Sequence, residues 1–199
     1  MNNGEAIVIN LAARYAAAFG AVAISKLLNK AILIKEDNKY DVEFYGDARS
    51  DAENITFEYA GEELLFGEML TGKNATTYAP PLMVSFSREK NLIETEASGS
   101  DSVVVERWGT KPWSIDIRGI LIDVENRQYP MNKINLLARF FEHNDIIEVV
   151  GEQFYDKDID SIYLTAVSIT PVEGFADTVQ ISLSAKSIKG VNYTLLNPM

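Results

Sequence analysis

The sequence contains no cysteine and a single histidine among its 199 residues. Without thiols, the chain has no disulfide framework, no cysteine-ligated zinc site and no cysteine nucleophile. Basic residues are also few, since 18 lysines and arginines face 29 acidic residues and leave a formal net charge of -11. Nucleic-acid backbones are bound by clustered basic side chains, so this balance argues against nucleic acid as a direct partner.

The apolar N-terminus lacks the features of a secretion signal or a membrane span. Residues 1–30 are rich in alanine and leucine, but Glu5 stands where a secretion signal carries positive charge. Arg14 and Lys26 then interrupt any uniform apolar span. We therefore expect neither secretion nor membrane insertion.

The residues that are present describe a folded protein. Apolar residues make up 47% of the chain and aromatic residues 10%, which is typical of a globular domain. We expect an N-terminal helix within residues 1–34, a linker or extended arm over 35–54, and a β domain over 55–199. The small and apolar residues of 5–30 fit an amphipathic helix that packs either on its own sheet or on another subunit.

Alternating apolar and polar residues predict the strands of the β domain. The segment WSIDIRGILID places Ile115 and Ile117 on one face and Asp116 and Arg118 on the other. Gly119 interrupts this strand, and we expect a bend or bulge there. Short links between the strands favour antiparallel pairing. The predicted strands cover 55–60, 83–87, 103–108, 114–123, 146–151, 161–170 and 177–188.

One helix is predicted inside the β domain, at about residues 131–143. Pro130 precedes it, and proline is well tolerated in the first turn of a helix. Ile134, Leu137 and Phe141 then recur at helical spacing. These elements together predict an α+β fold with antiparallel strands and one packed helix.

One cluster of aspartates suggests a calcium loop but departs from the motif. Asp156, Asp158 and Asp160 have the spacing that opens such a loop. Ser161 stands where the loop needs glycine, and Val167 stands where it needs a bidentate glutamate. We interpret the segment as a solvated turn before a strand.

Other polar residues also have structural interpretations. His143 ends the predicted helix, where an imidazole complements the helix C-terminus. Asp116, Asp123 and Glu125 could suggest a glycosidase pair, but an exposed ion pair with Arg118 is the simpler interpretation for Asp116. No Walker loop, Gly-x-Gly-x-x-Gly or Gly-x-Ser-x-Gly motif accompanies them. We expect no enzymatic activity, catalytic residue, metal or cofactor.

The segment PPLMVSFSREKNLIETEASGSDSVVVERWGTKPWSIDIRGIL resembles a pattern found in bacteriophage tail-tip and baseplate proteins. There, a strand near a charged turn leads to a similar second strand, a Tyr-Pro step into a helix, and a strand like IIEVVGEQF. The length and the C-terminal half also resemble DUF6046, a family from phages and prophages of Bacteroidetes. The resemblance implies a tail-tube-like antiparallel β-barrel or sandwich with one packed helix.

The same resemblance implies a structural role in the tail of a virion or in the baseplate of a phage-derived contractile injection system. Such a subunit forms a ring with copies of itself and contacts neighbouring tube or baseplate proteins, in a particle assembled in the bacterial host cytoplasm. The residues that we expect to make these contacts are Trp108, Trp113, Ile115, Ile117, Gly119, Tyr129, Pro130, Phe140 and Phe141.

An alternative is a tail-associated module that binds peptidoglycan or carbohydrate, or a cell-wall hydrolase. Trp108 and Trp113 would then stack on sugar rings, with Asp116 or Asp123 nearby. Packing in a core or a subunit interface is the competing interpretation of both tryptophans.

Overall fold

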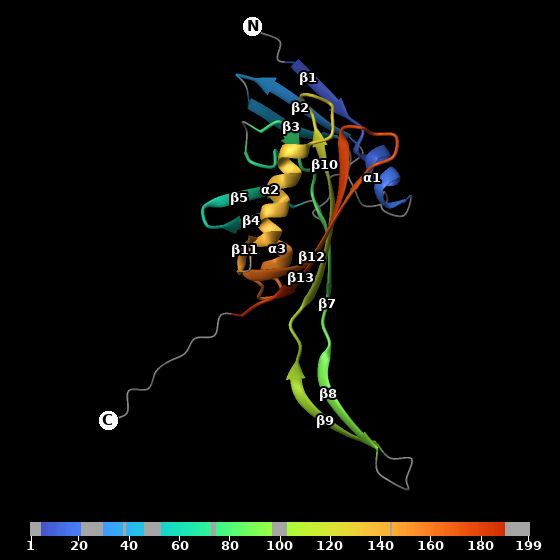
Figure 1. The fold of residues 1–199 in the computed structure, drawn as a ribbon, viewed down its shortest axis with the longest axis vertical. Helices are drawn as coiled ribbons and strands as arrows, with labels where there is room; N and C mark the ends of the chain where they lie inside the picture. The colour runs from blue at the N-terminus through green and yellow to red at the C-terminus, as the bar shows by residue number, and fades with distance from the viewer. Residues whose placement is uncertain are drawn as a thin grey trace, which may run out of the picture.

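The fold is built mainly from antiparallel strands, with three helices among the residues described (Figure 1). The computed structural model describes residues 5–20, 30–37, 39–45, 53–72, 75–96, 103–143 and 145–189. The α+β class is confirmed. The predicted barrel is wrong, because the largest sheet ends at open edges and does not close on itself within the described chain.

The largest sheet has eight strands in the order β5-β4-β11-β12-β13-β10-β6, and β7 also pairs with β10. These strands are β4 (Ile55–Tyr59), β5 (Glu62–Phe66), β6 (Thr77–Tyr78), β7 (Met83–Ser87), β10 (Ser114–Asp123), β11 (Ile147–Val150), β12 (Ser161–Pro171) and β13 (Thr178–Ser187). The predicted alternation in β10 is confirmed, since Ile115 and Ile117 are buried and Asp116 and Arg118 are exposed. One face of the sheet therefore carries the main core, and we call the opposite face the outer face.

Gly119 has a different role from the predicted bend or bulge. It faces Ile181 in a ladder between β10 and β13 that shows no shift in register. A Cβ atom at Gly119 would lie 2.5 Å from Cδ2 of Leu82. The glycine therefore makes room for a buried leucine, and the irregularity of the sheet lies instead in β12, between Leu164 and Ala166.

Helix α2 (Met131–Glu142) covers the main core, which confirms the helix predicted at about 131–143. Pro130 is buried at its N-terminal boundary, and Leu137 and Phe140 are buried against the sheet. The short helix α3 (Glu152–Tyr155) brings Phe154 into the same core. The sheet, α2 and α3 thus share one apolar cluster.

The N-terminal segment differs from the prediction of one long helix over residues 5–30. It forms β1 (Glu5–Ile9), α1 (Leu11–Phe19), β2 (Lys30–Glu36) and β3 (Lys39–Tyr45). The Asn10 side chain accepts a hydrogen bond from the Ala13 amide, and Gly20 at φ 83° ends the helix. Residues 21–29 lie outside the described chain.

The linker predicted over residues 35–54 is also corrected. β2 and β3 pair in register from Lys30 opposite Tyr45 to Glu36 opposite Lys39, and β1 pairs with the other edge of β2. Apolar and charged residues alternate in β3, and Ala31 and Leu33 are buried in β2, which suits a half-buried hairpin. Residues 46–52 of the predicted linker lie outside the described chain.

This N-terminal module packs on one end of the main sheet through a second core. Leu11, Tyr15 and Leu33 join Tyr78 and Ile120 in one buried cluster. The Tyr15 hydroxyl donates a 2.7 Å hydrogen bond to the Pro81 carbonyl, and burial raises its pKa. The described helix α1 therefore packs on its own sheet, which is one of the two partners predicted for the N-terminal helix.

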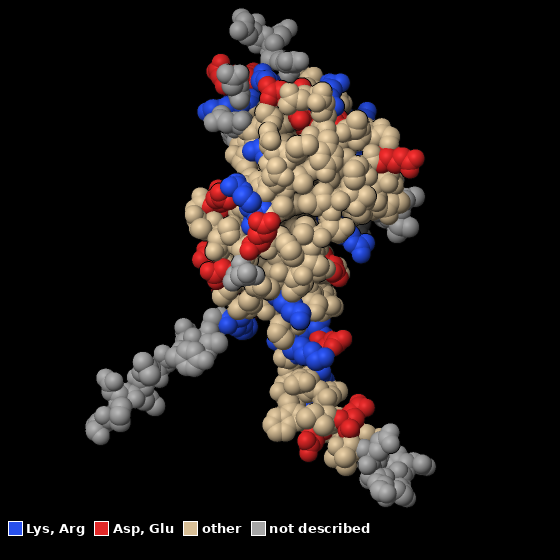
Figure 2. All heavy atoms as spheres, in the orientation of Figure 1, with Lys and Arg blue, Asp and Glu red and all other residues tan. Residues whose placement is uncertain are grey.

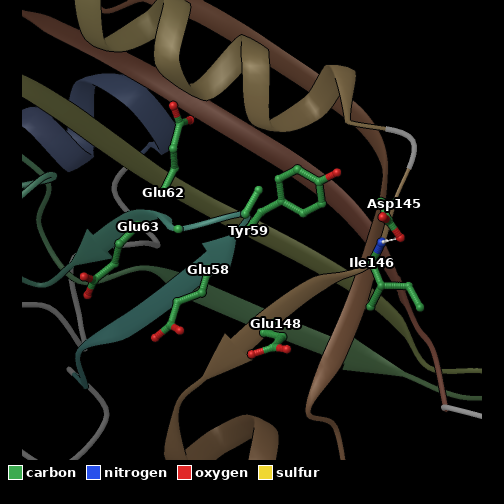
Figure 3. Close-up of a pocket in the computed structure, with 9 residues that line it drawn as sticks. Glu58, Tyr59, Glu62, Glu63, Asp145, Ile146 and Glu148 are labelled. Carbon is green, nitrogen blue, oxygen red and sulfur yellow. Dashed lines mark hydrogen bonds between the residues drawn. The ribbon is translucent and has the colours of Figure 1, made fainter.

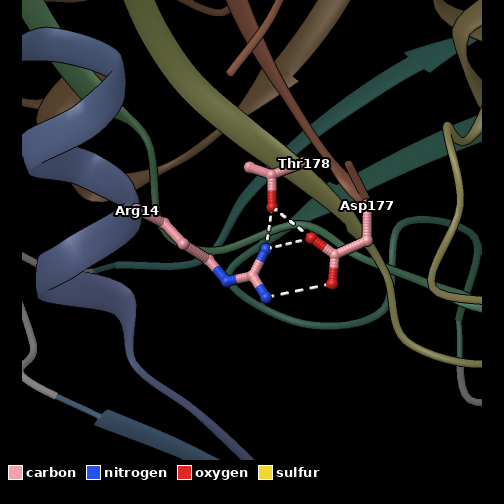
Figure 4. Close-up of polar contacts among 3 residues, drawn as sticks. All are labelled: Arg14, Asp177 and Thr178. Carbon is pink, nitrogen blue, oxygen red and sulfur yellow. Dashed lines mark hydrogen bonds and ion pairs between the residues drawn. The ribbon is translucent and has the colours of Figure 1, made fainter. Parts of the chain in front are cut away.

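An ion pair attaches α1 to the turn between β12 and β13 (Figure 4). Arg14 donates to both carboxylate oxygens of Asp177, with a 3.0 Å distance from Nη2 to Oδ2, and to the Thr178 hydroxyl. Its guanidinium lies 4.7 Å from the centre of the Phe175 ring. Burial acts to raise the pKa of Asp177, but the hydrogen bonds from Arg14 and Thr178 and the Arg14 charge lower it overall.

Replacing Arg14 with alanine should lower the free energy of unfolding by about 2 kcal/mol, because the largely buried Asp177 carboxylate loses its charged donor. The folded-state pKa of Asp177 lies below the unfolded-state value near 3.9. Its contribution is therefore complete above about pH 4 and is lost as the pH falls through the folded-state pKa. Denaturant unfolding from pH 7 to pH 2 measures both effects.

The control is Lys39→Ala, which removes an exposed cation from β3 and should change stability by less than about 0.5 kcal/mol. Asp177→Asn should flatten the acid limb of the stability profile in the same way as Arg14→Ala. Equal acid sensitivity in all variants would contradict the assignment of this contact.

Candidate assembly surface

A hairpin projects from the body of the protein (Figures 1 and 2). It consists of β8 (Lys90–Glu96) and β9 (Val103–Thr110), which pair only with each other among the described strands, and we call these two strands the arm. The arm extends the ribbon of β7 and β10, because Ser87 faces Ser114 and the Lys111 amide donates to the Glu89 carbonyl at 2.9 Å. One long hairpin therefore has its base in the sheet and its outer half beyond it.

The arm exposes apolar side chains to solvent. Trp108 is 67% exposed, and about half of the surface of each neighbouring apolar side chain is exposed: Leu92, Ile93, Val103, Val104 and Val105. An isolated two-stranded hairpin is only marginally stable in water, and exposed apolar patches mark interaction surfaces. The arm is thus a surface whose composition suits a partner.

A bulge lies at the base of the arm, near the sheet. The register shifts between Lys90 and Leu92, opposite the segment that contains Gly109. Gly109 has φ 110°, in the left-handed region that glycine tolerates. The bulge and Pro112 lie at the junction of the two halves, where they interrupt a continuous ladder.

Basic residues gather where the arm leaves the body, and Figure 2 shows blue side chains at this place. Arg88 donates from Nε to the Lys111 carbonyl at 2.9 Å and lies 5.3 Å from the centre of the Trp113 ring. Lys111 pairs with Glu89 at 2.8 Å, and this hydrogen bond lowers the pKa of Glu89. We call Arg88, Lys90 and Lys111 the basic collar.

Two edges of the main sheet are open and uncharged. β11 pairs with β12 only at Ser161 and Ile162, and no other described strand covers that side of β12 up to Pro171. β7 pairs only with β10 among the described strands. Neither strand contains a charged residue. The other described edges carry charges, as with Glu62 in β5 and Asp41 in β3, except for β6, which has only two residues and forms a bridge with Met69. Charges protect edges against pairing, so β7 and β12 are the edges suited to receive a strand.

The outer face between these edges carries small polar side chains. One row across the four strands is Ser85, Asp116, Ser184 and Ala166. The Ser184 hydroxyl donates to Asp116 at 3.2 Å. This part of the face is polar, and the end of α1 borders it, because Phe19 lines a hollow there together with Asp116 and Ser184.

At the far end of the same sheet, three glutamates lie side by side on adjacent strands. Glu63 faces Glu58, and Glu58 faces Glu148, and we call these three residues the glutamate row. They line a shallow pocket of about 580 Å³ (Figure 3). Glu62 points toward α2 instead and pairs with Arg139 at 3.5 Å. Like charges directly opposite each other in a sheet repel, so the glutamate row is unfavourable for the monomer.

The structure corrects several of the contact residues expected from the sequence. Ile115, Ile117 and Phe140 are buried in the main core, and Gly119 is buried against Leu82, so they cannot face another subunit. Pro130 is buried and Phe141 is half-buried, whereas Tyr129 is exposed. A strand over 103–108 was predicted, but its pairing with β8 into a hairpin that projects from the body was not.

The two tryptophans differ in environment. Trp108 lies on the arm and is exposed. Trp113 is half-buried, packs edge-on against Phe86 at 6.5 Å between ring centres, and has the Arg88 guanidinium over its ring. Trp113 therefore has a packing role, whereas no ring or cation contact of Trp108 is found among the described residues.

The polar residues that the sequence offered as possible catalytic groups make local structural contacts instead. The amides two and three residues after Asp123, those of Glu125 and Asn126, donate to its Oδ1 at 3.1 and 3.0 Å. Glu125 pairs with Lys35 at 3.3 Å, and the His143 ring stacks on Tyr59 at 4.1 Å between ring centres. These contacts give each group a structural task at the end of an element.

The aspartates of the calcium-like segment lie in the turn after α3. The Asp156 amide donates to the Glu152 carbonyl, Asp158 has φ 56°, and the Asp160 carbonyl accepts from Val149. Across the described ranges, no three His, Asp or Glu side chains are grouped so that they could hold a metal ion. No helix in the same ranges is long and apolar enough to cross a membrane.

Replacing residues 90–110 with Asn-Gly should leave the protein folded, because the β7–β10 ladder ends at Ser87 and Ser114 and the arm buries no apolar side chain in either core. The free energy of unfolding should change by less than about 1 kcal/mol. Denaturant unfolding followed by circular dichroism measures it.

Ile117→Ala serves as the core control for the arm deletion and should cost about 2–5 kcal/mol. A shortened protein that unfolds as readily as the core variant would show that the arm belongs to the folding unit.

One of three comparisons with known proteins, the match to a family model, agrees with the family suggested by the sequence. A search of curated proteins gave no match. A solved structure described as "Tail of empty GTA particle computed with helical refinement, C6 symmetry" matches with a TM-score of 0.35 and 12% identity, covering 75% of this chain and 99% of that chain. The domain of unknown function DUF6046 matches residues 77–198. The chain therefore belongs to the DUF6046 family.

Proposed function

We propose that the protein is a structural subunit of a phage tail or of a phage-derived contractile injection system, located at the baseplate or the tube-initiating end. The observation that carries this proposal is the pair of open, uncharged edges on opposite sides of one sheet, at β7 and β12. Its DUF6046 membership supports it, since the sequence pattern resembles phage tail-tip and baseplate proteins. The role requires no catalytic turnover.

The directions of the strands suit the joining of copies. β7 is antiparallel to β10, β10 to β13, and β13 to β12, so β7 and β12 run in opposite directions. A copy generated by rotation about an axis along the strands presents its β7 antiparallel to the β12 of its neighbour. Such a contact uses two different surfaces and closes into a ring when the rotation divides a full turn evenly.

The two faces of the sheet would then have different tasks. Helix α2 covers the core side, while the outer face between β7 and β12 offers serines and the oppositely charged Asp116 and Arg118. A polar face without a basic patch suits a passage for DNA, which it would not bind. The arm would reach other copies or neighbouring tail proteins, in a particle assembled in the host cytoplasm.

Cysteines introduced at Ser85 and Ala166 test the joining of edges, because the natural chain has no thiol. Both residues are exposed and lie in the same row of the outer face, one on β7 and one on β12. We expect a short bis-maleimide to link the double variant into a ladder of species on a denaturing gel. Electron microscopy of the unlinked protein should show rings.

The matched control carries cysteines at Ser85 and Asn135, an exposed position on α2 away from either edge. It should give no ladder above random collision. A ladder of equal intensity in both variants, or none in either, would contradict the proposed assembly.

The alternative role, in binding or hydrolysing cell-wall carbohydrate, has less support from the geometry. The ring of Trp113 is already packed by Phe86 and Arg88, and Asp123 is held by backbone amides. Trp108 is exposed, but it belongs to an arm that also exposes the aliphatic side chains of Leu92, Ile93 and residues 103–105. Such a surface suits protein contacts better than sugar stacking.

A further inference from the structure

The arm and the glutamate row are unexplained by the joining of edges alone. We infer that the basic collar of one copy docks against the glutamate row of a second copy. This ionic contact would set the register between β7 of one copy and β12 of the next. This inference rests on the proposed ring. Its occupant is a second copy of this chain, and its chemistry is cation to carboxylate.

The hydrogen-bonded ladder places the two groups at the same level of the sheet. Ser87 faces Ser114, Ser114 faces Lys186, and Lys186 faces Tyr163, which makes one row from β7 to β12. The base of the arm in one edge strand is therefore level with the start of β12, at the other edge.

The next row of backbone hydrogen bonds across the sheet lies level with both the basic collar and the glutamate row. The Ser187 amide donates to the Trp113 carbonyl and the Ile188 amide donates to the Ser161 carbonyl, each at 3.0 Å. Ser161 faces Glu148, the end of the glutamate row. On the opposite edge, the Lys111 amide bonds to Glu89 in the middle of the basic collar. A rotation that joins β7 to β12 without a large shift along the strands brings the collar to the row.

The open stretch of β12 also ends at this level. β11 occupies the edge of β12 at Ser161 and Ile162, so a β7 strand added by a neighbour must stop there. The neighbour's chain leaves its own sheet at the same level, through the bulge near Gly109 and Pro112. The arm then passes beside β11 and β4, which hold Glu148 and Glu58.

Charge favours this contact. No ion pair involves Glu58, Glu63 or Glu148 within the described residues, although Glu58 lies opposite both other glutamates. The chain is acidic overall, at -11, whereas the collar is net positive, because Arg88, Lys90 and Lys111 accompany the single carboxylate of Glu89. A cationic neighbour would relieve the repulsion within the row and gain attraction in addition.

Charge reversal tests the contact, in the background that carries cysteines at Ser85 and Ala166. Lys90→Glu and Glu148→Lys each alter an exposed residue, so the fold should be retained, as circular dichroism would verify. We expect each single reversal to slow crosslinking about tenfold, because attraction is replaced by repulsion of similar size. The double reversal should restore the rate to within about threefold, and about 1 M NaCl should reduce all differences.

Lys39→Glu is the matched control, since it makes the same charge change at an exposed position on β3 and should leave the rate unchanged. Unchanged crosslinking in both single reversals, or no recovery in the double reversal, would overturn the collar contact while the joined edges stand. Failure of the parent cysteine pair to form a ladder would overturn the ring and the collar contact together.

Discussion

The ladder between β10 and β13 determines where everything else in the protein can lie. It runs without interruption from Ser114 opposite Lys186 to Ile122 opposite Thr178. In its first half, only one face is apolar and the other is polar. In its second half, both faces are buried, because Leu121 belongs to the main core while Ile120 and Ile122 belong to the second core. Two cores therefore share one strand.

This sharing explains why the N-terminal module is part of the fold. The apolar residues on the outer face of the upper half of β10 need cover, and β1, α1 and β2 supply it. The Arg14–Asp177 pair then holds α1 against the turn that ends β12. At the lower half no apolar layer is needed on that face, so it stays polar, and the edges of β7 and β12 stay open.

The distribution of charged residues also differs between the parts of the surface proposed for assembly. The open edges carry none, the base of the arm is basic, and the glutamate row at the end of the sheet is acidic. A monomer gains little from this arrangement, since like charges face each other and apolar side chains stay in water. An assembly of copies gains from each of these features, which is why the proposed function and the collar contact are argued from the same sheet.

Much of the β domain could be predicted from the sequence, because local signals there agree with the final fold. The alternation around Ile115 and Ile117 marks a half-buried strand, and the apolar spacing after Pro130 marks α2. The family was also recognisable from the order of these segments. The N-terminal helix was overestimated because alanine and leucine have high helix propensity, while the pairing of β1 with β2 is a non-local contact that propensity does not report.

Only the tertiary structure decided which surfaces remain available. Whether a strand such as β12 is central or at an edge depends on which partners reach it, and the sequence of an uncharged strand is the same in either case. The closeness of Leu82 to Gly119 and the alignment of Glu58, Glu63 and Glu148 likewise come from residues that meet only when strands pair. The sequence by itself determined several strands and the helix α2 of the β domain, the acidic and thiol-free character and the family. The pairing of strands determined the arm, the open edges and the glutamate row, because each of these depends on contacts between segments that are distant in the sequence.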